Sequence, residues 1–123
     1  MTSSQLKYLN VIYMLSEKGS ARITDISNYM GFSKVSACRA VEKLVTENLV
    51  YKDEKKRLFL TETGRERFIK YKKSAEFLAE KLVDMLGCSR GSAKTDALNM
   101  VCAMSETNLD KIFKLRGNAK EAE

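Results

Sequence analysis

The amino-acid sequence predicts a mainly α-helical fold with one small β-hairpin. Apolar residues recur every three or four positions along most of the 123 residues, which is the spacing of a single helix face. The chain has no proline and only six glycines, so few positions interrupt a helix. One region departs from this pattern, because two short apolar runs at 49–51 and 58–60 flank a charged stretch, as the strands of a hairpin do.

Three helices are expected before the hairpin. The first covers 4–17, and the second begins at Ile23 with Ile26 on its inward side. Gly31 follows where the chain must turn, since a residue without Cβ adopts a positive φ at low cost. Ser33 is a suitable N-cap for the third helix because its hydroxyl accepts a hydrogen bond from a free backbone N–H.

The third helix has two chemically different sides. The apolar residues expected to face the core are Val35, Cys38, Val41, Leu44 and Val45. The residues expected on the opposite side are small, hydroxyl-bearing or cationic: Ser33, Lys34, Ser36, Ala37, Arg39, Ala40 and Lys43. No acid precedes Glu42 on this helix. A helix that enters the major groove of DNA needs such a surface, so these seven residues are the predicted DNA-facing set.

The hairpin follows this helix directly, which is the position of a wing. Its charged tip carries Lys55, Lys56 and Arg57, which are predicted to reach phosphates or the adjacent minor groove. A charged turn that is merely solvated is the alternative interpretation. With the wing included, residues 1–63 are predicted to form a winged helix–turn–helix DNA-binding domain.

The rest of the chain is expected to be helical. A long helix is predicted over 62–86, another over about 92–104, and a last short helix after Ser105. Together these helices carry more apolar surface than is needed to cover a winged helix. Residues 64–116 are therefore interpreted as a helical dimerisation domain, since two-fold dimers are the commonest oligomers. Residues 117–123 are expected to be a flexible polar tail.

Composition favours an anionic partner and argues against several function classes. The formal net charge is +6, and residues 1–60 carry ten Lys and Arg against six Asp and Glu. No apolar run approaches the roughly 18 residues of a membrane span, and no secretory signal opens the chain, so a cytoplasmic protein without a membrane partner is expected. There is no histidine, no glycine-rich phosphate loop and no nucleophile beside a base, so an enzyme is not expected.

Three stretches of the chain resemble one known family. They are YLNVIYMLSEKGSARITDISNYMGFSKVSA, EKLVTENLVYKDEKKRLFLTETG and MSETNLDKI. The chain resembles the diphtheria-toxin-repressor family over about residues 6–115, and most closely its short manganese-transport-regulator branch. The resemblance implies a homodimeric transcription regulator with an N-terminal winged helix–turn–helix and a C-terminal helical dimerisation domain.

Regulators of this family are usually activated by Mn²⁺ or Fe²⁺, which acids and histidines bind. The resemblance places these residues at the ligand positions: Lys7, Asn10, Lys73, Leu98, Val101 and Cys102. Mn²⁺ and Fe²⁺ need oxygen or imidazole donors, whereas an ammonium repels a dication and an aliphatic side chain donates nothing. We therefore expect no metal at these degenerate positions, no cofactor and no activation by metal.

Two replacements for the metal are left open by the sequence. Lys73 is a candidate fixed positive charge that pairs with a nearby acid such as Glu76 or Asp96. Alternatively, Cys88 and Cys102 sense oxidants or a soft ligand, because a thiolate near lysines is more reactive than a thiol. A cysteine on an apolar helix face is otherwise explained by packing.

The residues as a whole point to a sequence-specific regulator, a repressor, that binds double-stranded DNA as a homodimer. Arg39 is the best candidate for a bidentate contact to guanine. Lys34 and the three wing cations are expected to contact phosphates, which positions the protein without specifying sequence. The competing class is a winged-helix protein-interaction module that does not read DNA sequence.

Overall fold

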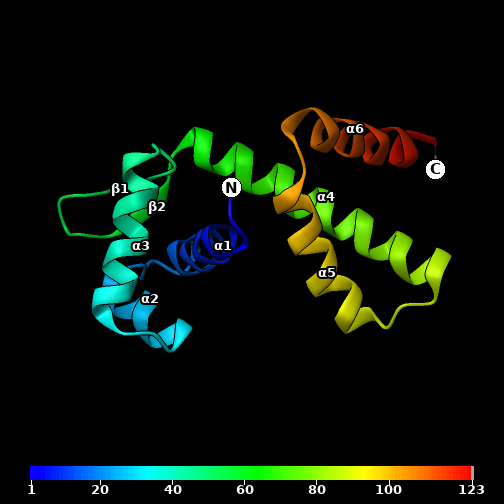
Figure 1. Cartoon of the computed structure of the whole chain (residues 1–123). Helices are drawn as coiled ribbons and strands as arrows, with labels where there is room; N and C mark the ends of the chain where they lie inside the picture. The colour runs from blue at the N-terminus through cyan, green and yellow to red at the C-terminus, as the bar shows by residue number, and fades with distance from the viewer. Residues whose placement is uncertain (123) are drawn as a thin grey trace. The chain divides into compact units, whose positions relative to one another are not determined.

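The structure, a computed structural model, describes the backbone of residues 1–122 and the side chains of residues 1–117 (Figure 1). Over these residues the elements are, in order, α1 (Ser3–Glu17), α2 (Ile23–Met30), α3 (Lys34–Thr46), β1 (Val50–Lys52), β2 (Leu58–Leu60), α4 (Glu62–Leu86), α5 (Arg90–Ala103) and α6 (Glu106–Ala122). The predicted fold class, mainly helical with one hairpin, is confirmed. None of the described helices combines the length and apolar composition that a membrane span requires.

The chain divides into two compact units. The N-terminal unit comprises Ser4–Phe68, and the C-terminal unit comprises Met1–Ser3 together with the chain from Ile69 onward. The division falls inside α4, which is continuous from Glu62. The domain boundary expected between residues 63 and 64 therefore lies within the first turn of a helix, and the assignment of separate DNA-binding and dimerisation domains stays a prediction.

The N-terminal unit has a core to which α1, α2, α3 and the hairpin all contribute. Its fully buried large side chains include Leu9, Ile12, Ile26, Leu44, Leu49 and Leu58. Burying each such side chain contributes about 1.5–3 kcal/mol relative to leaving it exposed. In the hairpin, β1 pairs antiparallel with β2, with Tyr51 opposite Phe59 and their rings stacked. The core, rather than the short hairpin alone, holds α3 and the wing in place.

The turn between α2 and α3 forms as the sequence predicts. Gly31 has a φ of 73°, and its N–H donates to the Ser27 carbonyl at 3.0 Å. The Ser27 hydroxyl donates to the Phe32 carbonyl at 2.6 Å. Ser33 Oγ accepts from the Ser36 N–H at 3.1 Å, which confirms it as the N-cap of α3. The direction in which α3 leaves the turn is therefore held by several local hydrogen bonds.

The start of α4 is fastened closely to the residues that lead into β1. Thr61 Oγ1 donates to the Asn48 carbonyl at 2.7 Å and accepts from the Gly64 N–H at 2.9 Å. The Thr61 N–H donates to the Leu49 carbonyl at 3.0 Å. Gly64 is buried, and a Cβ on it would lie 2.0 Å from the Leu49 carbonyl oxygen. This close approach requires glycine at position 64.

The C-terminal unit consists of helices that bury several small and aliphatic residues. Ala93, Ala97 and Val101 are fully buried on α5, as is Leu109 on α6. Lys70 of α4 forms an ion pair with Asp110 of α6. The last helix is longer than the short one expected, because its backbone stays helical through Ala122 and so includes most of the predicted tail. Lys, Glu and Ala in that stretch are good helix formers, and a polar composition does not by itself end a helix.

Candidate nucleic-acid interface

The rotation of α3 about its axis differs from the sequence prediction. Ala37, Val41 and Leu44 are buried, whereas Val35 is 61% exposed and Val45 is 42% exposed. The sequence placed both valines inside because they are strongly apolar and have helical spacing. The tertiary structure instead turns the Ala37 side of the helix inward, toward the core that α2 also contacts.

Ala37 is therefore wrong as a DNA-facing residue, because it is fully buried. A small side chain permits close approach to DNA, but it equally allows α3 to approach the core of its own unit. Ala40 is half-buried and lies at the edge of that inward face. The remaining members of the predicted set on α3 are exposed: Ser33, Lys34, Ser36, Arg39 and Lys43.

The exposed face of α3 carries unpaired cations at its centre and flanks. Lys34, Arg39 and Lys43 are exposed and, over the described residues, form no ion pair with a carboxylate. The helix N-terminus adds a partial positive charge at Ser33 and Ser36, whose hydroxyls also contact each other at 3.0 Å. Exposed donors and positive charge on one side of a helix suit contacts with phosphates and base edges.

Sequence reasoning missed two residues of this face. Val35 is exposed, and Glu42, which is also exposed, lies one turn beyond Arg39 on the same side. The surface is thus not free of acids along its whole length. The sequence carries a signal for this orientation, because Ala37, Val41 and Leu44 form a helical stripe of their own, but alanine contributes little to an apolar pattern.

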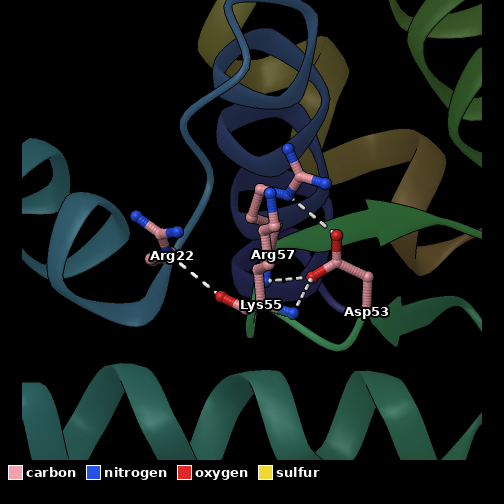
Figure 2. A network of polar contacts seen from close by, with 4 residues as sticks. All are labelled: Arg22, Asp53, Lys55 and Arg57. Carbon is pink, nitrogen blue, oxygen red and sulfur yellow. Dashed lines mark hydrogen bonds and ion pairs between the residues drawn. The ribbon is translucent and has the colours of Figure 1, made fainter.

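The wing tip is organised by the carboxylate of Asp53 (Figure 2). Asp53 Oδ1 accepts from the backbone N–H of Lys55 at 3.0 Å and of Arg57 at 2.7 Å. Asp53 Oδ2 accepts from Arg57 Nε at 2.7 Å, which completes an ion pair. Lys56 has a φ of 63°, the left-handed conformation that lets the chain reverse. These contacts give the hairpin a defined tip although it lacks the glycine typical of tight turns.

The Asp53 contacts separate the roles of the three wing cations. Arg57 is half-buried, pairs with Asp53, and lies 5.9 Å from the centre of the Phe59 ring, so its guanidinium builds the wing rather than extending freely from it. Lys55 and Lys56 are exposed. Desolvation raises the pKa of the Asp53 carboxyl, but the hydrogen bonds from Arg57 and Lys55 and the charge of Arg57 together hold this pKa below its usual value.

The wing is also tied to the helix–turn–helix. Arg22, which precedes α2, donates from Nε to the Lys55 carbonyl at 3.1 Å (Figure 2). The Leu58 N–H donates to the Ala21 carbonyl at 2.7 Å. Asp25 accepts from the Arg22 N–H at 3.0 Å and so fastens the start of α2 to the same segment. These contacts therefore hold the wing tip against the segment that leads into α2.

Replacing Asp53 by alanine should weaken binding to every DNA duplex by a similar factor and leave sequence preference unchanged. The substitution removes the acceptor for the Lys55 and Arg57 N–H groups, so the wing tip loses its fixed conformation before binding and must be ordered on the duplex. Titrations of several unrelated duplexes at one salt concentration test this. Asp53→Asn, which keeps one acceptor oxygen, should lose less. A change in the preferred sequence would contradict this role of Asp53.

Most side chains at the family's metal-ligand positions lack the oxygen or imidazole donors that Mn²⁺ and Fe²⁺ need. Lys7 and Asn10 are exposed, and Val101 is fully buried. Lys73 Nζ lies 3.8 Å from Glu76 Oε2, so Glu76 rather than Asp96 is its partner. The described part of the chain contains no group of three or more His, Cys, Asp or Glu side chains that could hold a metal ion. The chemistry of these positions therefore does not fit the family's metal.

Cys102 shows little sign of a reactive thiol. Burial raises the pKa of the Cys102 thiol, and the positive charge of the chain's N-terminal amino group at Met1 opposes this increase only in part. A higher pKa means a smaller fraction of thiolate, which is the form that reacts with oxidants. The oxidant-sensing hypothesis is thus weakened at Cys102, while at the half-buried Cys88 it stays a prediction.

Comparison with known proteins finds a family model similar to the N-terminal part and solved structures with a similar fold. Residues 1–58 match the family described as "Iron dependent repressor, N-terminal DNA binding domain". No curated protein sequence matches the chain. Among solved structures, the hypothetical protein SSo2273 from Sulfolobus solfataricus is similar with a TM-score of 0.79 and 19% identity, over 96% of this chain and 91% of that one.

Two solved regulators share the same fold. The manganese regulator SloR is similar with a TM-score of 0.73 and 23% identity, over 90% of this chain and 52% of that one. IdeR from T. acidophilum is similar with a TM-score of 0.65 and 20% identity, over 91% of this chain and 53% of that one. The chain thus spans about half the length of these two regulators.

Proposed function

Because residues 1–58 match the model of an iron-dependent repressor DNA-binding domain, we propose that this protein is a sequence-specific transcriptional repressor. It binds double-stranded DNA as a homodimer and does so without activation by metal. The observation that carries the proposal is the exposed, cation-bearing face of α3, with Arg39 at its centre, beside an ordered wing that presents Lys55 and Lys56.

Independence from metal rests on the donor set. Lys7 and Lys73 bring positive charge to positions where the family supplies ligands, and Leu98 and Val101 supply no donor atom. The Lys73–Glu76 pair supports a permanent charge in place of a metal, although both side chains are about half exposed and such a pair contributes little stability in water. We infer that the conformation that binds DNA forms without a bound metal ion.

Assembly as a homodimer is supported by apolar side chains exposed on the C-terminal unit. Met85 is 77% exposed and Leu86 is 72% exposed at the end of α4, and Met100 and Leu115 are exposed on α5 and α6. Exposed apolar side chains that gather on one surface mark a contact with a partner, and we propose that these four side chains meet a second copy of the chain. Two copies would also present two α3 helices, as repressors that read two half-sites require.

The test is selection of bound sequences from a random DNA pool, performed with Mn²⁺ and again with a chelator. We expect one enriched sequence with two related half-sites, the same in both conditions and bound with the same affinity. Light scattering of the free protein, in both conditions, should give the mass of two chains. Enrichment only in the presence of Mn²⁺ would overturn metal independence, and a single half-site with monomeric mass would overturn the dimer.

A protein-interaction module is the second candidate function, and one observation favours it. Several large apolar side chains on the N-terminal unit are exposed around α2, α3 and the wing: Tyr29, Phe32, Val35, Val45 and Tyr51. An apolar surface of this kind suits a protein partner better than a phosphate backbone. No affinity for duplex DNA even at low salt would favour this function over DNA reading.

A further inference from the structure

Glu42 is an acid on the face of α3 that otherwise carries cations. It lies three residues after Arg39 and is exposed on the same side of the helix. At a DNA surface a carboxylate is repelled by phosphates, so an exposed acid on this face weakens binding unless it gains a specific hydrogen bond. The presence of a carboxylate on this face therefore calls for a contact that compensates the repulsion.

Within the described chain, Glu42 has a thiol neighbour but no cation partner. Cys38 Sγ lies 3.6 Å from Glu42 Oε1, where the thiol donates weakly to the carboxylate. No Lys or Arg of the described residues forms an ion pair with Glu42. The carboxylate thus keeps most of its capacity to accept hydrogen bonds and is steadied on one side by the preceding turn of α3.

The surface beside Glu42 is an open hollow between α3 and the wing, with a volume of about 450 Å³. Besides Glu42, its lining residues are Ile23 of α2, Cys38, Val41, Val45 and Thr46 of α3, and Lys52 of β1. The wall next to the carboxylate is therefore largely apolar. A group that fits this site has a hydrogen-bond donor directly beside an apolar edge.

Among base edges in the major groove, cytosine has this arrangement. Its N4 amino group donates, and the neighbouring C5–H edge is apolar, whereas adenine places the acceptor N7 beside its N6 amino group. A carboxylate would repel that N7. We propose that Glu42 is a specificity-determining residue that accepts a hydrogen bond from N4 of a cytosine, with Cys38 and Val45 against the C5 edge of the same base. This inference rests on the proposed DNA-reading function.

Glu42→Ala should lower the preference for cytosine and raise the affinity for unrelated duplexes. Selection from a random DNA pool with the wild-type protein should enrich cytosine at one position of each half-site, and Glu42→Ala should lose that preference alone. We also compare the affinity for the enriched duplex with the affinity for a duplex in which that cytosine is replaced by another base. The ratio of these two affinities should fall by about tenfold. Affinity for unrelated duplexes should rise by about two- to fivefold, because one negative charge leaves the surface.

Two further variants make the test specific. Glu42→Gln should shift the preference toward adenine, because an amide both donates and accepts and so matches N7 and N6. Glu54→Ala is the matched control: it removes an exposed acid from the wing tip, so it should raise affinity for all duplexes and leave the enriched sequence unchanged. If Glu42→Ala behaves like Glu54→Ala, the proposal is overturned while the DNA-reading function stands. If the wild-type protein enriches no sequence, both are overturned.

Discussion

Replacing Arg39 by alanine is expected to remove the preference for guanine at one position of each half-site while leaving most of the affinity for unrelated DNA. Arg39 is exposed near the centre of the outward face of α3 and has no carboxylate partner among the described residues. Its guanidinium has the fork geometry that pairs with O6 and N7 of guanine, a contact worth about 1–3 kcal/mol of discrimination. Competition titrations of the enriched duplex against a random duplex, at one fixed salt concentration, measure this loss.

Lys56→Ala is the comparison variant that distinguishes loss of base recognition from loss of electrostatic attraction to phosphates. Lys56 lies at the wing tip, where a phosphate contact would add affinity on every sequence. Its removal should weaken all duplexes alike and reduce the salt slope of binding by about one. Arg39→Lys, which keeps the charge but loses the fork, should behave like Arg39→Ala in specificity. An equal loss on all duplexes from Arg39→Ala would contradict its assignment as the guanine contact.

Gly64→Ala is expected to destabilise the N-terminal unit strongly. The added Cβ would lie 2.0 Å from the Leu49 carbonyl oxygen and 2.8 Å from its carbonyl carbon. Both atoms belong to the backbone that leads into β1, so relief requires α4 or the hairpin to move. Overpacking of this kind costs about 3 kcal/mol or more when the neighbour cannot yield. Urea unfolding followed by circular dichroism measures the change in the free energy of unfolding.

Gly91→Ala provides the matched control for this substitution. Gly91 lies in the first turn of α5, and a Cβ there would meet no atom within 4 Å. Because alanine favours helix and restricts the unfolded chain, Gly91→Ala should leave stability unchanged or raise it by up to about 1 kcal/mol. Similar destabilisation by both substitutions would show that the close approach at Gly64 is not the cause.

The positions of the elements could be predicted from the sequence because their signals are local. Gly31 adopts the left-handed conformation, and Ser33 caps α3, since a missing Cβ and a short hydroxyl act on neighbouring backbone groups. The long helix predicted over 62–86 has those bounds in the structure. In contrast, the length of α6 was underestimated, because a polar stretch without a strong stop signal carries little information about where a helix ends.

The candidate site could be predicted only in part. Exposed cations on α3 were identified, because charged side chains rarely enter a core. Ala37 and Val35 were exchanged between the inner and outer faces, because small and apolar residues fit either environment when two stripes of helical spacing overlap. The role of Asp53 was missed entirely, because its three acceptor contacts depend on the shape of the folded hairpin tip.

The sequence by itself determined where helices begin and where the chain turns. It also determined that residues 1–60 are basic and that the sequence contains no histidine. Those features depend on backbone preference and composition, which act over a few residues. Only the tertiary structure decided which side of α3 faces outward, that Arg57 is paired within the wing, and that Glu42 borders an open hollow. These depend on packing between segments distant in sequence, where the volume available at each contact, rather than the polarity of one residue, selects the arrangement.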